Sequence, residues 1–349
     1  MKTTFISTSA ISEATRASLI KLQTQLAQAQ TEVSTGRYAD MGVSLGYKTG
    51  QTVSLRSEQS RLTTIMETNS VVATRLDSTQ SALTALAGDA QTFVGQLLGA
   101  RDAPSGPQVI QNQAQTSLKA FADMLNTSID GAYLFAGINA DVKPMSQYDQ
   151  NPPSPASQAV ANAFFATFGI TQDDPAVANI SGDDMQTFLD TTFASLFQDP
   201  AWTANWSSAS DQNIRSRIST SELIETSTNT NEDAIRQLAS AYTMAADLGT
   251  QNLGQGAFQA VVDTATKIVA QAIQGLTGLQ SDLGTAQQRV DDANSRMSIQ
   301  KDILTNHISS MEDVDPYEAS TRVNTLMTQI ETAYSMTARI QQLSLLNYL

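Results

Sequence analysis

Apolar residues recur at alternating spacings of three and four residues through most of the C-terminal part of the chain. The pattern begins at Phe258 and ends at Val314, and only Gln300 and His307 interrupt it with polar side chains. Spacing of this kind is typical of a long helix that packs against partner helices. The core positions are Phe258, Val262, Ala265, Val269, Ala272, Leu276, Leu279, Leu283, Ala286, Val290, Ala293, Met297, Gln300, Leu304, His307, Met311 and Val314.

Three glycines lie inside this pattern, at Gly275, Gly278 and Gly284. Each costs roughly 1 kcal/mol relative to alanine in a helix interior, so the sequence leaves open one helix or two or three collinear helices. One unbroken helix would span roughly 85 Å at ~1.5 Å per residue, which is longer than a globular domain requires. The pattern therefore predicts a rod, and rods are more typical of assembly proteins than of enzymes.

The N-terminal part of the chain carries the same spacing in further runs. The first run ends at Gly36, a candidate helix C-cap, and a glycine-rich link follows it as far as Gly50. A second run covers 55–97 and a third covers 110–125. Polar residues interrupt the second run at Glu58, Asn69 and Thr79. The last run of the chain covers 323–343, after a proline at position 316.

Prolines mark the middle of the chain as a different module. Six of the nine prolines lie between positions 144 and 200, whereas 1–103 and 201–315 contain none. Because proline breaks helix interiors, this distribution indicates two long helical arms around a central insert. Within and beside the insert, the sequence predicts short helices at 159–168 and 185–197 and strands at 133–136 and 217–224.

These elements predict a mainly α fold. The N- and C-terminal arms are expected to form an elongated antiparallel helical bundle or coiled-coil rod, with a small mixed α+β central insert. We expect three divisions of the chain: terminal assembly helices, a helical rod domain and an outward-projecting central module. Their bounds are 1–45 with 315–349, 46–137 with 218–314, and 138–217.

Composition narrows the classes of function. The chain has 34 acidic and 20 basic residues, a net charge of −14, which argues against binding to nucleic acid or to an anionic membrane. It contains no cysteine, so disulfides and thiolate metal sites are excluded. No apolar run approaches the ~20 residues that span a bilayer, so we expect no membrane insertion. The first ten residues lack the apolar core of a cleaved signal peptide, which predicts either a cytoplasmic protein or export by another route.

Few residues could carry chemistry. His307, the one histidine, lies at a core position of the long pattern, where we expect a structural polar residue that sets helix register. Adjacent aspartates at 173–174, 183–184 and 291–292 lack the spacing of a calcium loop and are expected at helix caps or on solvated faces. Trp202 and Trp206 are expected to anchor a small core rather than to form a ligand platform. We therefore predict no enzyme activity, no cofactor and no metal site, with an enzyme of unusual type as a remote alternative.

Both ends of the chain resemble bacterial flagellins and hook-associated proteins. Residues 279–290 (LQSDLGTAQQRV) are similar to the C-terminal helical segment of that family, and residues 311–319 (MEDVDPYEA) resemble the acidic break before its last helix. The chain ends in LSLLNYL, similar to the leucine-rich terminus of the family. VSTGR at 33–37 occupies the place of the Ser/Thr-Gly motif after the first helix. The resemblance covers both arms and leaves the central module unassigned.

Within this family, AYLFAG at 132–137 resembles the hook-filament junction group, hook-associated protein 3. The Ser-Ser-Gly and Asp-Asp-Ala-Ala-Gly stretch typical of filament flagellins is missing. The resemblance implies that the terminal helices form a coiled-coil inner shell, and that the protein is exported unfolded to the extracellular flagellum without a cleaved signal peptide. The implied partners are further copies of the chain in a helical or ring-like assembly, another hook-associated protein, flagellin and an export chaperone.

The apolar stripes of the two termini are the expected assembly sites. Isolated amphipathic helices of this length are only marginally stable, so we expect 8–34 and 319–349 to be disordered in the free subunit and to order against neighbouring copies. The residues expected to make these contacts are Leu19, Leu22, Leu26, Val33, Val323, Leu326, Ile330, Ile340, Leu343, Leu345, Leu346 and Leu349. Two other functions stay open: a filament flagellin, and a secreted coiled-coil adhesin or effector whose central module binds a ligand.

Overall fold

The computed structural model describes the backbone of residues 8–346 and the side chains of residues 10–339. The chain is mainly helical, with 73% of its residues in helices, and its central region contains only short strands, as the sequence predicts. It divides into two compact units. Unit 1 comprises Met1–Thr63 and Ser298–Leu349, and unit 2 comprises Thr64–Met297. The three-part division expected from the sequence stays a prediction.

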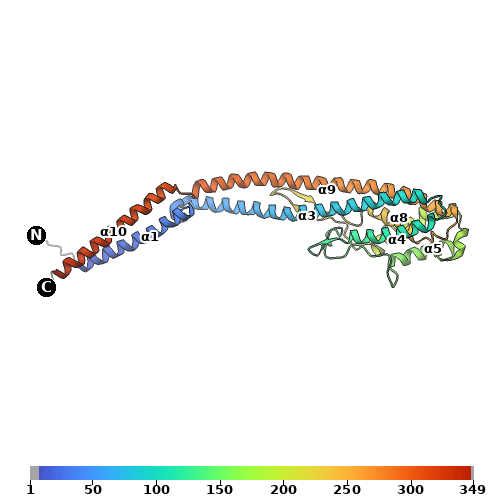
Figure 1. Cartoon of the computed structure of the whole chain (residues 1–349), viewed down its shortest axis with the longest axis horizontal. Coiled ribbons are helices and arrows are strands. Elements are labelled where there is room, and N and C mark those ends of the chain that lie inside the picture. Colours follow the sequence, from blue (N-terminus) through green and yellow to red (C-terminus); the bar gives the residue numbers. More distant parts are fainter. Residues whose placement is uncertain (1–7, 347–349) are drawn as a thin grey trace. The chain divides into compact units, whose positions relative to one another are not determined.

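Two long helices form most of unit 1. Helix α1 (Thr8–Thr35) and helix α10 (Pro316–Leu346) run antiparallel and side by side (Figure 1). The side chains that this contact covers alternate at spacings of three and four on both helices, which is the pattern of a coiled coil. On α1 they are Thr15, Leu19, Leu22, Leu26 and Ala29, and on α10 they are Ala319, Val323, Leu326, Ile330, Ala333 and Thr337.

A short link joins α1 to the next long helix. Gly36 has a φ of 72°, and its N–H donates to the carbonyl oxygen of Glu32 at 2.9 Å, so Gly36 caps α1 as predicted. Asp40 caps the short helix α2 (Met41–Leu45) by accepting a backbone N–H of its first turn at 3.0 Å. The 3-10 turn η1 (Gly46–Lys48) then leads directly into helix α3 (Thr49–Ala100). The expected irregular link is therefore shorter and partly helical.

In unit 2, helix α3 runs antiparallel to helix α9 (Gln255–Glu312). The side-chain amide of Gln287 donates to Asp77 at 2.5 Å, and that of Gln280 donates to Thr84 at 2.9 Å. The second pair lies one heptad away from the first on each helix. The two helices therefore keep one register along this stretch, as two strands of a coiled coil do.

Helix α9 is continuous through the three glycines of its apolar pattern. A Cβ atom at Gly275 would lie 2.8 Å from the Cβ of Ala234, so glycine lets another helix approach α9 closely at this point. A Cβ at Gly278 would meet nothing within 4 Å. The sequence left open one helix or several collinear helices, and the structure contains one. Of Gly275 and Gly278, only Gly275 is required for close packing.

The buried stripe of α9 shifts after Met297. Up to Met297 the predicted core positions are buried, apart from the half-buried Leu279. Beyond it, Gln300 and His307 are exposed, so their predicted core positions are wrong. A four-residue step replaces a three-residue step here, which brings Ile308 into the core in place of His307. The covered side chains of this end are Lys301, Leu304, Ile308 and Met311.

Polar residues interrupt the confirmed apolar stripe of α3 where they find partners. The buried amide of Asn69 donates to the Asn294 side chain at 2.7 Å and to the backbone carbonyl of Ile218 at 2.9 Å. Buried Thr79 donates to the carbonyl oxygen of Arg75, one turn earlier, at 2.8 Å. These bonds compensate the loss of water at the Asn69 amide nitrogen and the Thr79 hydroxyl, whereas the Asn69 Oδ1 is buried without a partner. Asn69 ties α3 to α9 at one register.

Two further helices complete the bundle of unit 2. Helices α4 (Gly106–Leu125) and α8 (Asp233–Asp247) pack together beside α3 (Figure 1). The ring of Tyr242 contacts Phe93 and Phe121 edge-on, with centroid distances of 5.1 and 5.9 Å. The Tyr242 hydroxyl donates to Asp89 at 2.7 Å. One aromatic side chain therefore links three of the helices.

Two short antiparallel hairpins contain the strands of the described chain. Strand β1 (Ser128–Ile129) pairs with β2 (Ala132–Tyr133), and β3 (Arg215–Arg217) pairs with β4 (Leu223–Glu225). The strands predicted at 133–136 and 217–224 are therefore wrong in extent. The second segment folds back at its Ser-Thr-Ser sequence, because short polar side chains favour turns over strand continuation.

Short helices surround an aromatic core in the part of unit 2 formed by the centre of the sequence. They are α5 (Pro155–Phe168), η2 (Pro175–Asn179), α6 (Gly182–Phe188), the π-helical turn η3 (Leu189–Phe193) and α7 (Ala201–Asn205). The helices predicted at 159–168 and 185–197 correspond to α5 and to α6 with η3. Trp202 and Trp206 are buried and stacked with ring centroids 5.7 Å apart, which confirms the core role expected of this pair.

Candidate assembly interface

The contact between α1 and α10, the terminal seam, contains most of the residues expected to mediate assembly. Leu19, Leu22, Leu26 and Val323 are half-buried in it, and Leu326 and Ile330 are buried, with 8% and 9% of their surface exposed. These side chains face partners within the same chain. Val33 lies outside the seam and is exposed. The expected residues Ile340, Leu343, Leu345, Leu346 and Leu349 lie outside the described side chains.

Two helices leave the terminal seam incomplete. None of the three α1 leucines in it is fully buried, although Leu326 and Ile330 of α10 are buried in the same seam. Large apolar side chains also lie exposed on the flanks of the seam, at Ile20, Met327, Tyr334 and Met336, and the Tyr334 hydroxyl accepts from Gln23 of α1 at 3.0 Å. Met327 and Tyr334 are one heptad apart and each follows a seam residue by one position. A search for a single apolar stripe per helix passes over such a second stripe, which is why the sequence did not single it out.

The interruptions of the two arms meet in unit 1. The Tyr38 N–H donates to the carbonyl oxygen of Glu312 at 3.0 Å, and the Val314 N–H donates to that of Gly36 at 2.9 Å. The chain just after α1 therefore forms a short antiparallel bridge with the chain just after α9. The acidic break at 311–319 is thus part of a hydrogen-bonded joint rather than a free loop.

Two buried carboxylates hold this joint. Glu312, with 1% of its surface exposed, accepts both Nε (2.9 Å) and Nη2 of Arg56 from α3. This hydrogen bonding lowers the pKa of Glu312 and raises the pKa of Arg56 from their ordinary values. Buried Glu32 accepts from Arg322 of α10 at 2.9 Å. Because a buried carboxylate requires a cation, each arginine fixes one helix at the joint.

Apolar side chains also project from unit 1 close to the joint in the sequence. Val43, Tyr47 and Tyr317 are almost fully exposed. Ile299 and Ile303, one turn apart on α9, are exposed as well. Single exposed apolar residues are ordinary on protein surfaces, but several on one small unit are typical of a surface that contacts other proteins.

Net charge is divided unequally between the two units. Unit 1 contains ten Lys or Arg and ten Asp or Glu, whereas unit 2 contains ten and twenty-four. The whole excess of fourteen negative charges therefore lies in unit 2. A neutral unit can pack against its own copies without net repulsion, whereas an acidic unit favours solvent over close packing with itself.

The histidine and the aspartate pairs that the sequence offered for chemistry lie on an exposed helix face or at helix starts. His307 is exposed on α9, Asp174 caps η2 by accepting from the Ala176 N–H at 2.8 Å, and the aspartates at 183–184 lie in the first turn of α6. In the part of the chain that the structure describes, no group of three or more His, Cys, Asp or Glu side chains could hold a metal ion. None of the helices within 8–346 combines the length and hydropathy of a membrane-spanning segment.

Comparisons with known proteins agree with this arrangement. Residues 6–140 match the bacterial flagellin N-terminal helical region, and residues 266–349 match the bacterial flagellin C-terminal helical region. A solved structure from Vibrio parahaemolyticus, assigned as a flagellar hook-associated protein, is similar in fold, with a TM-score of 0.51 and 12% sequence identity. The similarity covers 76% of this chain and 97% of that chain. No curated protein matches the chain.

Proposed function

The chain belongs to the bacterial flagellin family, and from that premise we propose that it is the subunit that joins the flagellar hook to the filament. Members of this family are structural, non-enzymatic proteins of the extracellular flagellum. The chain is accordingly an axial structural protein of the flagellum. The junction role and the contacts that produce it are the proposal.

The observation that carries the assembly mechanism is the incomplete terminal seam. Leu19, Leu22 and Leu26 are only half-buried by α10, and the flanks of the seam carry further apolar side chains. Burial of such side chains is the main favourable term in protein association. We propose that helices α1 and α10 of neighbouring copies supply the missing coverage, so that a multi-helix shell replaces the two-stranded coiled coil.

The distribution of charge supports the same mechanism. Neutral unit 1 is the part that would pack closely with its own copies, and acidic unit 2 is the part that would remain in solvent. The joint between the arms, with its buried Glu32 and Glu312, would keep the terminal seam at a defined place in each subunit. The expected disorder of 8–34 and 319–349 in the free subunit stays a prediction. Limited proteolysis that leaves both termini intact in the monomer would contradict it.

The junction role is proposed over that of a filament flagellin because AYLFAG at 132–137 resembles the junction group. Its proposed partners are another hook-associated protein, flagellin and an export chaperone. Electron microscopy of cells that lack the gene tests this role. Hooks without filaments, restored by the cloned gene, would support it, and normal filaments would contradict it.

A secreted adhesin or effector is the second candidate function. Deletion of the last 30 residues distinguishes it from an axial protein. An adhesin would keep its ligand binding after this deletion, whereas a junction protein would lose its place in the flagellum and the cells would lose motility.

A further inference from the structure

A hollow of about 430 Å³ lies in unit 2, between α4, the loop before α5 and the end of α8. This volume lies within the range of sites that hold small ligands. A second, more open hollow shares Gln115, Lys119 and Asp149 with the first and continues along α4. The two hollows therefore form one groove, which we call the α4 groove. It is distinct from the terminal seam, and nothing in the assembly mechanism uses it.

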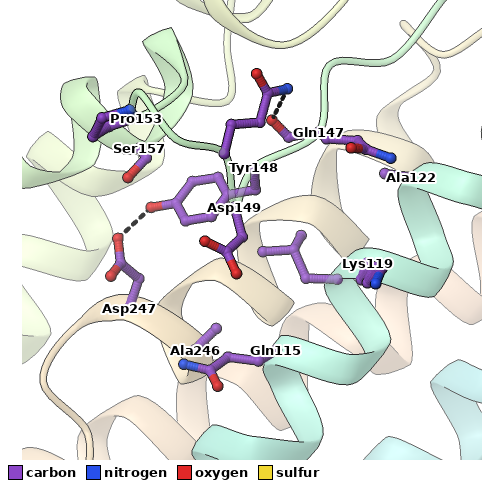
Figure 2. A pocket seen from close by; sticks show the side chains of 12 residues that line it. Gln115, Lys119, Ala122, Gln147, Tyr148, Asp149, Pro153, Ser157, Ala246 and Asp247 are labelled. Carbon is purple, nitrogen blue, oxygen red and sulfur yellow. Dashed lines mark hydrogen bonds between the residues drawn. The ribbon is translucent and has the colours of Figure 1, made fainter.

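The loop that walls the groove is firmly held. The ring of Tyr148 stacks on buried Trp206, with centroids 5.3 Å apart and planes 19° apart. The Tyr148 hydroxyl donates to Asp247 at the end of α8 (Figure 2). Ser154 donates to the Tyr148 carbonyl oxygen at 2.8 Å and so closes the loop on itself. A site with fixed walls loses little entropy when a ligand binds.

The groove presents hydrogen-bond donors and acceptors side by side. Besides the paired Tyr148 and Asp247, its polar lining is Gln115, Lys119, Gln147, Asp149, Gln150 and Ser157, and Asn112, Thr116 and Asp123 extend it along α4. Carboxamides donate and accept, as do hydroxyl groups. Small apolar contacts from Leu118, Ala122 and Ala246 lie among these groups. This mixture fits a ligand that carries many hydroxyl groups on a compact ring with C–H faces.

Charge in the groove further restricts the ligand. Within the described residues, neither Lys119 nor Asp149 makes an ion pair or a side-chain hydrogen bond, and Figure 2 shows the Asp149 carboxylate between Tyr148 and Gln115. Asp123 and Asp247 add two more carboxylates against the single ammonium group. Burial, together with the carboxylates of Asp173 and Asp149, raises the pKa of Asp247 to about 6, as expected for a site with excess negative charge.

We propose that the α4 groove binds a short neutral or amino-substituted oligosaccharide and rejects acidic sugars. The Gln115 carboxamide and the side-chain oxygens of Gln147 and Gln150 pair with ring hydroxyls, since the amide nitrogens of the latter two already donate to Asp123 and to the Gln147 backbone. Asp149 accepts from a hydroxyl or ammonium group of the ligand. An acidic sugar would place its carboxylate beside Asp149 and Asp123 and meet like charge there. Lys119, the one cation of the groove, is insufficient to offset three carboxylates.

An oligosaccharide array tests this proposal. The full-length chain, fluorescently labelled, is applied to immobilised neutral, amino-substituted, sialylated and uronic-acid oligosaccharides at pH 7.5. We expect binding to members of the first two classes and at least tenfold weaker binding to the acidic classes. Isothermal titration with the strongest binder then compares the native chain with Asp149→Asn, which should bind at least tenfold more weakly. Asp141→Asn, an exposed aspartate of the same unit, should bind like the native chain.

A second variant protects the test from misfolding. Gln115→Trp fills the groove from α4 with a larger side chain and should abolish binding, and thermal unfolding identifies any variant that has lost its fold. Three results would each overturn the proposal: no class bound above the Gln115→Trp level, binding to acidic sugars alone, or an Asp149→Asn variant with unchanged affinity.

Discussion

Two exposed methionines on opposite flanks of the α10 seam give the sharpest test of where the assembly contacts lie. Met327 and Met336 are 46% and 56% exposed, so replacement of both by serine should leave the isolated subunit intact. Leu326, the neighbour of Met327, is buried in the terminal seam of its own chain. The two sites are adjacent in sequence but act in different states of the protein.

The magnitudes follow from burial. Complete burial of a methionine side chain contributes roughly 1.5–3 kcal/mol, so burial of the exposed half contributes about 1 kcal/mol at each site. The double variant Met327→Ser/Met336→Ser should therefore lose about 2 kcal/mol of association free energy, or ~30-fold in the association constant. Leu326→Ala should instead weaken the terminal seam, wherever it is ordered, by about 2 kcal/mol, at the low end for a buried leucine because only two helices surround it.

The assay is complementation of cells that lack the gene. An export-competent but assembly-defective subunit should accumulate in the medium as monomer, and swimming should decline in proportion. Thr328→Ser, at an exposed position of the same helix on neither methionine flank, serves as the matched control. If the double methionine variant is incorporated as well as the native chain, the exposed flanks of α10 are not an assembly surface and the reasoning fails.

Three further predictions concern stability, each measured by thermal or denaturant unfolding of the free subunit. Arg56→Ala removes the cation of buried Glu312 and should cost about 2 kcal/mol in unit 1. Because the native pKa of Glu312 is lowered, the ionised carboxylate stabilises unit 1 above its unfolded pKa, and this stabilisation is lost on acidification. The variant should lack that acid-dependent loss. The same dependence of stability on acid pH in the variant and the native chain would contradict this. Asp247 has a folded pKa raised to about 6, so its ionisation destabilises unit 2 above that pH. Asp247→Asn should raise stability at pH 8 by up to about 2 kcal/mol and abolish the gain in stability that this carboxyl gives as the pH falls from about 6 towards 4. Gly278→Ala should stabilise α9 by up to ~1 kcal/mol, whereas Gly275→Ala should destabilise it because its Cβ would clash with Ala234, and equal effects would refute the packing argument.

The helical framework could be predicted because long 3,4-spaced patterns leave few alternatives. The stripes of α3 and α9 were identified almost residue by residue as far as Met297. The prediction failed where the pattern offered two registers. His307 continued the heptad pattern, but it is polar, whereas its neighbour Ile308 is apolar. Burial of Ile308 in place of His307 shifts the stripe.

The joint and the α4 groove lay beyond sequence reasoning for a different reason. Glu312 and Arg56 are separated by 256 residues, and neither stands in a motif that marks it as an ion pair. The groove likewise combines ordinary Gln, Asp and Lys side chains from three distant segments. Such sites depend on tertiary contacts, whereas glycine at position 36 and the proline-rich centre act locally and were identified correctly.

The central claim is that exposed flanks of the terminal helices contact other copies of the chain. Since the native chain contains no cysteine, one introduced thiol reports on one position alone. Met327→Cys should react rapidly with a maleimide in the free subunit and at least tenfold more slowly in intact flagella, while Asp141→Cys in unit 2 should react equally in both. Equal reactivity of the thiol at position 327 in the free and the assembled protein would contradict the account.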